Sequence, residues 1–268
     1  MSRLQLKQTR TNAIYVRSLC ALSADELLLA CGDAGLRALS LHTGELAARE
    51  PTVLRYVWRV AFDAHTNMLL IVQPPANTVQ LVSLRRNASE WLEVQRLYNT
   101  IFDEIPFVHM EVCYSNVLIG SGGKETLYLF DVSAAHTLSY AGSVVHQCYG
   151  LACALRNCDT FVAIANLTSV SLQRLASSPQ RREHIATSVE FVRGKPLLRG
   201  ELLLVVDFDG PTNKCVIVSF RETDNVLTER RGLLDDQESG YVTAWTLAGD
   251  QLVLAIKNSK SLLVFDIV

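Results

Sequence analysis

Short apolar runs recur along the whole chain at nearly regular intervals. Six runs are rich in Leu, Ile, Val or Phe and are bounded by turn residues: 27–30, 68–72, 117–119, 161–165, 202–206 and 252–256. Their centres lie about 41 to 50 residues apart, and a period of this size indicates repeated units of secondary structure. Each run is too short for a helix, so the pattern predicts strands that are buried on both faces.

Further strand-like segments flank each apolar run. The segments before the runs end in turns rich in Asn, Asp, Ser and Gly, and they cover 15–22, 57–64, 107–113, 149–155, 189–192 and 242–247. The segments after the runs cover 36–41, 78–84, 126–132, 170–175, 215–220 and 261–267. A fourth, more polar segment follows in five units, at 46–49, 91–97, 137–144, 182–185 and 227–233. In the fifth unit, residues 193–200 are interpreted as an insertion before the buried strand.

The sixth unit stops at Val268 without a fourth segment, whereas residues 3–8 alternate polar and apolar side chains. A ring of sheets hides the edges of its first and last sheets when one terminus lends a strand to the other. We therefore expect residues 4–7 to form the outer strand of the last sheet. The prediction is an all-β, six-bladed β-propeller, with one domain over 1–268 and blades at about 10–50, 51–99, 100–145, 146–187, 188–235, and 236–268 plus 1–9.

One stretch carries a resemblance to a known family. Residues 27–46, LLLACGDAGLRALSLHTGEL, resemble the core "LLASGSxDGxVRLWDLxTGEL" of the WD40 β-propellers, and LFDV at 129–132 and VFDI at 264–267 resemble its second half. Phe-Asp stands where the family has Trp-Asp, and the Gly-His dipeptide is missing, so the buried polar network of typical blades is not expected. The resemblance implies a WD40-like propeller that presents its loops to protein partners.

The amino-acid composition excludes some classes of protein and makes others less expected. Hydrophobic residues make up 49% and charged residues 19% of the chain, which allows a large core and excludes a disordered chain. The net charge of −2 provides no overall field that would attract nucleic acid or a membrane. Residues 1–10 lack the apolar core of a secretory signal, and seven cysteines without paired spacing favour a reducing compartment. We expect an intracellular protein, cytoplasmic or nuclear, with no membrane partner.

Two groups of residues bear on metal binding. Asp207 and Asp209 match the start of a calcium loop, but the later ligands of such a loop are missing, which favours a solvated turn. A possible zinc set lacks the usual close pairs, which favours core cysteines, and it comprises His146, Cys148, Cys153 and Cys158. Neither a phosphate loop nor a nucleophile elbow is present. We therefore expect no metal, no cofactor, no small-molecule substrate and no enzymatic activity.

Basic and apolar loop residues are the candidate partner-binding residues. The predicted topology places several basic residues on one face, which would dock an acidic partner unless they are ordinary mixed surface charge: Arg85, Arg86, Arg181, Arg182, Arg193, Lys195 and Arg199. Leu197 and Leu198 either form an exposed contact patch or extend a strand inward. Tyr98 and Phe102 lie in an apolar segment between blades, which binds a partner or packs over the central channel.

The prediction for function is a non-enzymatic, WD40-like scaffold or adaptor within a multisubunit intracellular complex. This step rests on analogy between folds. Three alternatives remain. Arg85 and Arg221 stand where WD40 receptors of ubiquitin ligases carry the Arg of "WDxR", which would make the protein a substrate-receptor subunit. A propeller-type enzyme is the second, and a nucleic-acid-associated subunit that binds through the basic face is the third.

Overall fold

The computed structural model describes strands and the turns between them. The described residues are 4–11, 15–48, 56–73, 80–87, 90–98, 108–113, 116–121, 125–145, 148, 150–156, 159–166, 169–175, 182–187, 196–199, 202–209, 214–223, 226–233, 242–256 and 261–267. Within these ranges the chain forms no helix, and therefore none that is long and apolar enough to cross a membrane.

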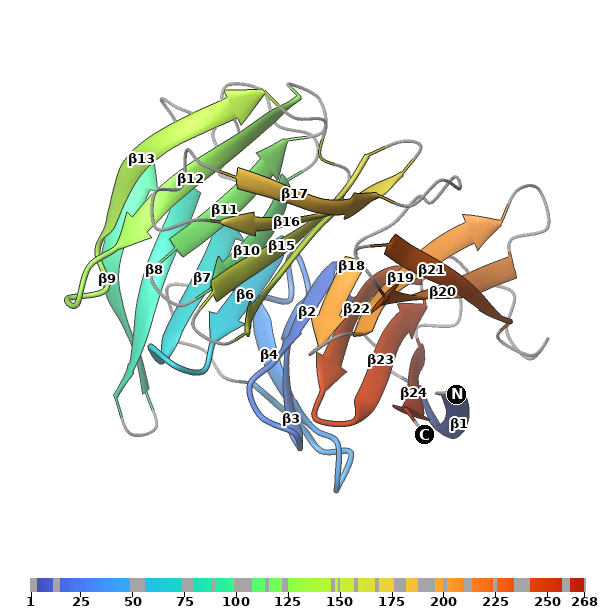
Figure 1. Ribbon diagram of the computed structural model, residues 1–268. Coiled ribbons are helices and arrows are strands. Elements are labelled where there is room, and N and C mark those ends of the chain that lie inside the picture. The colour runs from blue at the N-terminus through green and yellow to red at the C-terminus, as the bar shows by residue number, and fades with distance from the viewer. Residues whose placement is uncertain are drawn as a thin grey trace. The chain divides into compact units, whose positions relative to one another are not determined.

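The described strands form six antiparallel sheets of four strands each (Figure 1). The first sheet comprises β2 (Ser18–Ala21), β3 (Glu26–Ala30), β4 (Leu36–Ser40) and β5 (Leu46–Ala48). The second comprises β6 (Arg59–Asp63), β7 (Met68–Gln73), β8 (Gln80–Asn87) and β9 (Glu90–Tyr98). The third comprises β10 (Val108–Cys113), β11 (Asn116–Ser121), β12 (Thr126–Val132) and β13 (Leu138–Val145). Consecutive strands pair in each of these sheets, as expected for a repeated meander.

The remaining sheets follow the same order, with one exception at the end of the chain. The fourth comprises β14 (Gly150–Arg156), β15 (Asp159–Ala165), β16 (Val170–Leu175) and β17 (Arg182–Thr187). The fifth comprises β18 (Pro196–Arg199), β19 (Leu202–Asp209), β20 (Lys214–Thr223) and β21 (Val226–Leu233). The sixth comprises β22 (Val242–Ala248), β23 (Gln251–Ile256), β24 (Ser261–Ile267) and the first strand of the chain, β1 (Leu4–Thr11).

The pairing of β1 with β24 brings the two ends of the chain into one sheet. The two strands are antiparallel, with partners from Leu4 and Ile267 to Thr11 and Ser261, and a bulge lies between Leu6 and Gln8. Figure 1 shows the N and C labels beside these strands. β1 extends to Thr11, beyond the predicted 4–7. The N-terminal segment is thus the outer strand of the last sheet, and closure of a ring through it stays a prediction.

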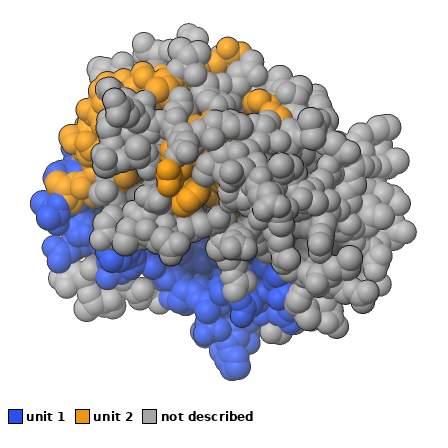
Figure 2. All heavy atoms as spheres, in the orientation of Figure 1, with its two compact units in different colours: residues 1–104, 134–137, 240–268 blue, residues 105–133, 138–239 orange. Residues whose placement is uncertain are grey.

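The chain divides into two compact units, coloured separately in Figure 2. Unit 1 contains residues 1–104, 134–137 and 240–268, and unit 2 contains residues 105–133 and 138–239. Within unit 1, β2 contacts both β22 and β6. Within unit 2, β14 contacts both β10 and β18. In each unit, therefore, the first strand of the middle sheet lies between the first strands of the other two sheets. The expectation of a single domain over 1–268 stays a prediction.

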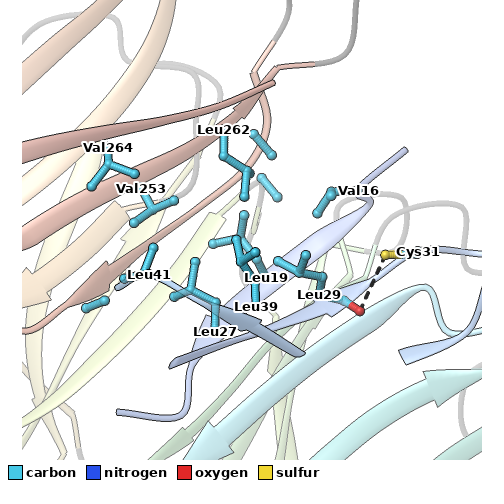
Figure 3. Close-up of a cluster of buried hydrophobic side chains, with 13 residues drawn as sticks. Val16, Leu19, Leu27, Leu29, Cys31, Leu39, Leu41, Val253, Leu262 and Val264 are labelled. Carbon is cyan, nitrogen blue, oxygen red and sulfur yellow. Dashed lines mark hydrogen bonds between the residues drawn. The ribbon is translucent and has the colours of Figure 1, made fainter. Parts of the chain in front are cut away.

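The continuous apolar runs are explained by burial on both faces of the sheets. In β3, Leu27 and Leu29 pack into a cluster with residues of β23 and β24, which include Val253 and Val264 and are drawn together in Figure 3. The intervening Leu28 packs on the opposite face with residues of β7 and β8. Fully burying one such side chain stabilises the fold by roughly 1.5–3 kcal/mol. This arrangement accounts for strands that show no alternation of apolar and polar residues.

The first strand of the fifth sheet corrects the sequence prediction. The strand that pairs with β19 is β18, Pro196–Arg199, with Arg199 opposite Leu202. It lies in the segment that the sequence analysis interpreted as an insertion, whereas the predicted strand at 189–192 is outside the described residues. Proline is tolerated as the first residue of an edge strand because no ladder hydrogen bond from its nitrogen is required there. The apolar pair Leu197 and Leu198 was therefore the better signal for this strand.

Candidate protein-binding surface

Most of the predicted partner-binding side chains are not described. Arg85 is exposed near the end of β8. The strands β8, β9, β17 and β18 contain four further candidates whose side chains are not described: Arg86, Tyr98, Arg182 and Arg199. Four candidates lie outside the described residues: Phe102, Arg181, Arg193 and Lys195. The basic docking face therefore stays a prediction.

The two leucines of the predicted contact patch belong to a strand. Leu197 is buried in β18 and Leu198 is half-buried. The sequence left open whether these leucines form an exposed contact patch or extend a strand inward. For Leu197, the structure shows the strand. An exposed hydrophobic contact at this residue would require β18 to leave its sheet, which its pairing with β19 opposes.

A group of arginine and aromatic side chains in unit 1 was not predicted from the sequence. We call Tyr15, Arg17, Trp58 and Arg59 the arginine–aromatic surface. The Arg17 guanidinium lies 5.5 Å from the ring centre of Tyr15 and 5.3 Å from that of Trp58. Arg17 is exposed, and 36% of the Trp58 surface is accessible. Cation–π contacts of this kind contribute about 0.5–1 kcal/mol each at exposed sites and hold the guanidinium in place between the rings.

Backbone hydrogen bonds fix the two segments that carry this surface. The Arg17 amide donates to the Ala30 carbonyl at 2.8 Å, and the Trp58 amide donates to the Val72 carbonyl at 2.9 Å. Each residue is therefore held to a strand of its own sheet. The Arg59 guanidinium donates from Nη1 to the Arg17 carbonyl at 2.8 Å and so connects the two sheets directly. The surface consequently sits on rigid strand ends, which suits a recognition site.

A turn between β3 and β4 is hydrogen-bonded to the segment that carries Trp58. The Gly32 amide donates to the Val57 carbonyl at 3.0 Å, and the Val57 amide donates back at 3.2 Å. Gly32 has φ of +59°, and a Cβ at this position would lie 2.9 Å from Nε of Arg17. Glycine is therefore required here both for its backbone conformation and for the approach of the guanidinium.

Tyr56 has an unusual backbone next to this surface. Its φ is +62°, although non-glycine residues, and bulky ones above all, rarely adopt the left-handed region. Its side chain is 51% exposed, so no burial of the ring compensates for the strain. Strained residues of this kind concentrate at functional sites, and Tyr56 is a second exposed aromatic residue two positions before Trp58 in the chain.

The electrostatics of the surface are positive. Burial lowers the pKa of Arg59, and the charge of Arg17 lowers it further, partly offset by Tyr15. Among the residues that the structure describes, Arg17 forms no ion pair and its guanidinium donates no hydrogen bond. Asp33 is exposed and follows Gly32 in the chain, yet no ion pair joins it to Arg17. Two guanidinium groups therefore share this surface, and no described carboxylate pairs with that of Arg17.

The sequence contains a signal for this surface that the repeat analysis did not use. Tyr-Val-Arg at 15–17 and Tyr-Val-Trp-Arg at 56–59 occur in successive units. Arg17 and Arg59 are separated by 42 positions, which is one repeat. Both segments were predicted only as first strands of blades, because an apolar-polar pattern does not show which aromatic rings stay exposed. The recurrence of Tyr-Val closely followed by Arg would have directed attention to the strand starts.

Two described cysteines are chemically protected by burial. Burial raises the pKa of the Cys31 thiol to about 11, against a smaller lowering by Arg37. Burial raises the pKa of Cys148 to about 12, against a smaller lowering by a hydrogen bond with the backbone of Gly150. Of the other residues weighed as zinc ligands and interpreted as a non-metal group, Cys153 is half-buried, and His146 and Cys158 lie outside the described residues. The described part of the chain contains no group of three metal-binding side chains.

We predict that Cys31 and Cys148 resist alkylation in the folded protein. The thiolate is the reactive form, and both thiols are neutral and covered at neutral pH. Site-resolved mass spectrometry after iodoacetamide treatment should show both unmodified, with modification only after denaturation. Because the folded pKa of Cys148 is raised, its contribution to stability is present below the ordinary value of 9.0 and is lost as pH rises towards about 12. Rapid labelling of Cys148 in the native state would contradict its burial.

Comparison with known proteins identifies the fold. No family model matches the sequence, and no curated protein sequence matches it significantly. The structure is similar to a chain of the mitotic checkpoint complex, with a TM-score of 0.63 and 11% identity over 99% of this chain and 93% of that one. It is also similar to the WD40 repeats of RRP9, with a TM-score of 0.61 and 10% identity over 99% and 100% of the two chains.

A third solved structure shows the same kind of fold. A chain from a nidogen–laminin complex matches with a TM-score of 0.55 and 12% identity over 82% of this chain and 80% of that chain. At these identities the likeness concerns the fold alone. The fold is that of a WD40-like β-propeller, which confirms the resemblance found in the sequence. The number of blades and the closure of the ring stay predictions.

Proposed function

We propose that the protein is a non-enzymatic scaffold or adaptor that binds protein partners through the arginine–aromatic surface. The observation that carries this proposal is the exposure of Trp58, whose ring centre lies 5.3 Å from the exposed Arg17 guanidinium. Trp, Tyr and Arg are the residue types most enriched among the energetically dominant contacts of protein interfaces. A large aromatic side chain left in water contributes little to folding, whereas covering it with a partner stabilises a complex. The intracellular, multisubunit setting expected from the sequence belongs to this proposal.

The proposed architecture is a six-bladed ring closed by β1. Two observations support it. In each unit the first strands of three successive sheets lie next to one another, which is the arrangement around the axis of a propeller. In the sixth sheet, β1 covers the edge of β24 that would otherwise be open for pairing. A closed ring presents its strand ends on a rigid frame, which suits a scaffold.

Affinity purification with quantitative mass spectrometry tests this function. The wild-type chain, Trp58→Ala and the control Leu92→Ala are expressed at equal levels in the same cells. Leu92 lies in β9 and is 47% exposed, so its substitution also removes an exposed apolar side chain. We expect Trp58→Ala to reduce the recovery of specific subunits at least about tenfold, as for a dominant interface residue, and Leu92→Ala to retain them.

Melting temperatures of the three proteins serve as a folding control. The proposal is contradicted when Trp58→Ala melts like the wild type and recovers the same subunits in the same amounts. Equal losses with Trp58→Ala and Leu92→Ala would also contradict it, because they would show that binding does not depend on this surface.

A further inference from the structure

We infer that Arg17 in the arginine–aromatic surface binds the carboxylates of an acidic peptide segment in a partner protein. This inference rests on the proposed function and specifies the chemistry of the partner. Its first support is the position of the Arg17 guanidinium, which lies 5.5 Å from the ring centre of Tyr15 and 5.3 Å from that of Trp58. The rings hold the group without using its N–H donors in conventional hydrogen bonds.

The donors of Arg17 have no partner in the described part of the chain. Among the described residues, the guanidinium donates no hydrogen bond and forms no ion pair. A guanidinium has five N–H donors in a planar fork, and this fork matches a carboxylate with two parallel hydrogen bonds. By contrast, the described Arg96 is already paired in this way, with Nε and Nη2 donating to the two carboxylate oxygens of Glu93. Arg17 has the same donor fork, and no carboxylate of the described residues pairs with it.

The positive charge of Arg59 near Arg17 favours binding of an anion. Arg59 donates to the carbonyl of Arg17 at 2.8 Å, so the two positive side chains lie in adjoining positions. Burial lowers the pKa of Arg59, and the charge of Arg17 lowers it further, as expected for neighbouring like charges. A bound carboxylate would relieve this repulsion as well as satisfy the donors of Arg17.

The surroundings favour a peptide over other anions. Trp58 and Tyr56 expose 36% and 51% of their surfaces, and such rings cover the apolar parts of a peptide on either side of an acidic residue. Nucleic acid is bound through rows of basic side chains that neutralise successive phosphates. This surface has two arginines rather than a row, and the chain has a net charge of −2. Charge complementarity therefore points to an acidic peptide.

Fluorescence anisotropy with defined peptides tests the inference. The probe is a fluorescein-labelled decapeptide of alternating glutamate and glycine, and the comparison peptide has glutamine in place of glutamate. Both are titrated with the full chain at physiological salt. We expect saturable binding of the glutamate peptide and at least about tenfold weaker binding of the glutamine peptide, since hydrogen bonds to charged groups contribute most of the difference.

Matched variants locate the binding site. Arg17→Gln is expected to weaken binding of the glutamate peptide at least about tenfold, and Arg17→Lys, which keeps the charge but loses the fork, is expected to weaken it less. The control Arg174→Gln removes a half-buried arginine of β16 and should leave the affinity within about twofold. Circular dichroism and melting curves establish that each variant is folded.

Several outcomes would overturn the inference. The first is equal affinity for the two peptides. The second is that Arg17→Gln and Arg174→Gln weaken binding of the glutamate peptide equally. The third is that Arg85→Gln weakens this binding and Arg17→Gln does not. Tighter binding of oligodeoxythymidine, or of the same peptide with phosphoserine for glutamate, would assign the surface to phosphates instead. Suppose that neither peptide binds, but Trp58→Ala still recovers fewer subunits from cells than the wild type does. The proposed scaffold function then stands, and only the inference of an acidic partner is wrong.

Discussion

Deletion of residues 1–11 is expected to lower the free energy of unfolding by about 4 kcal/mol, because it removes the whole of β1 from the sixth sheet. Each backbone hydrogen bond contributes about 0.5–1.5 kcal/mol net, and β1 pairs with β24 from Leu4 to Thr11. The deletion also leaves the edge of β24 unpaired, which favours association between chains. Urea unfolding followed by circular dichroism measures the loss, and size-exclusion chromatography detects the association.

A shorter deletion and a peptide rescue make this result specific. Removal of residues 1–3, which precede β1, should leave the stability within about 0.5 kcal/mol of the wild type. A synthetic peptide of residues 1–14 should restore the stability of the shortened protein in a concentration-dependent manner. Equal stability of the full chain and the chain without residues 1–11 would show that β1 does not support the last sheet.

Substitution of Gly120 by alanine is expected to lower the free energy of unfolding by about 2–3 kcal/mol, because it overpacks the core of unit 2. Gly120 lies in the second strand of its sheet, β11, opposite His109 and Leu127. A Cβ at this position would overlap the sulfur of Cys148 and lie 2.9 Å from its Cβ. Cys148 is completely buried, so its side chain has little room to move away.

A compensating substitution tests the stated cause. Cys148→Gly removes both atoms that the new methyl group would contact, so Gly120→Ala with Cys148→Gly should be more stable than expected from the sum of the two single substitutions. The difference is measured as a coupling energy in a double-mutant cycle by chemical unfolding. Additive effects, or an unchanged stability of Gly120→Ala, would show that these two residues do not pack against each other.

The repeat pattern was the most informative property of the sequence. Runs such as 68–72 were predicted as buried strands, and β7 has its side chains buried on both faces. The prediction succeeded because strands of this kind are buried on both faces, as β3 is between the sixth and second sheets of unit 1, which removes polar residues from them. The prediction of an N-terminal strand in the last sheet used a different argument, namely that an unpaired sheet edge is unfavourable.

Two features were less accessible from the sequence, for different physical reasons. The strand β18 is only four residues long, and a segment with Pro196 at its start and leucines within it fits either a loop or a short edge strand. The arginine–aromatic surface depends on contacts between sheets. Arg17 and Trp58 are far apart in the chain and meet only because β2 packs beside β6. Local patterns predict strands well, but they do not show which side chains meet at the strand ends.

Amide hydrogen exchange of β1 tests the central structural claim most directly, namely that both ends of the chain form one sheet of the scaffold. We expect alternate amides between Leu4 and Thr11 to be protected to a degree similar to those of β24, because an outer strand donates alternate hydrogen bonds to its one neighbour. Exchange of all these amides at the rate of an unstructured peptide, while β22 to β24 stay protected, would contradict the account.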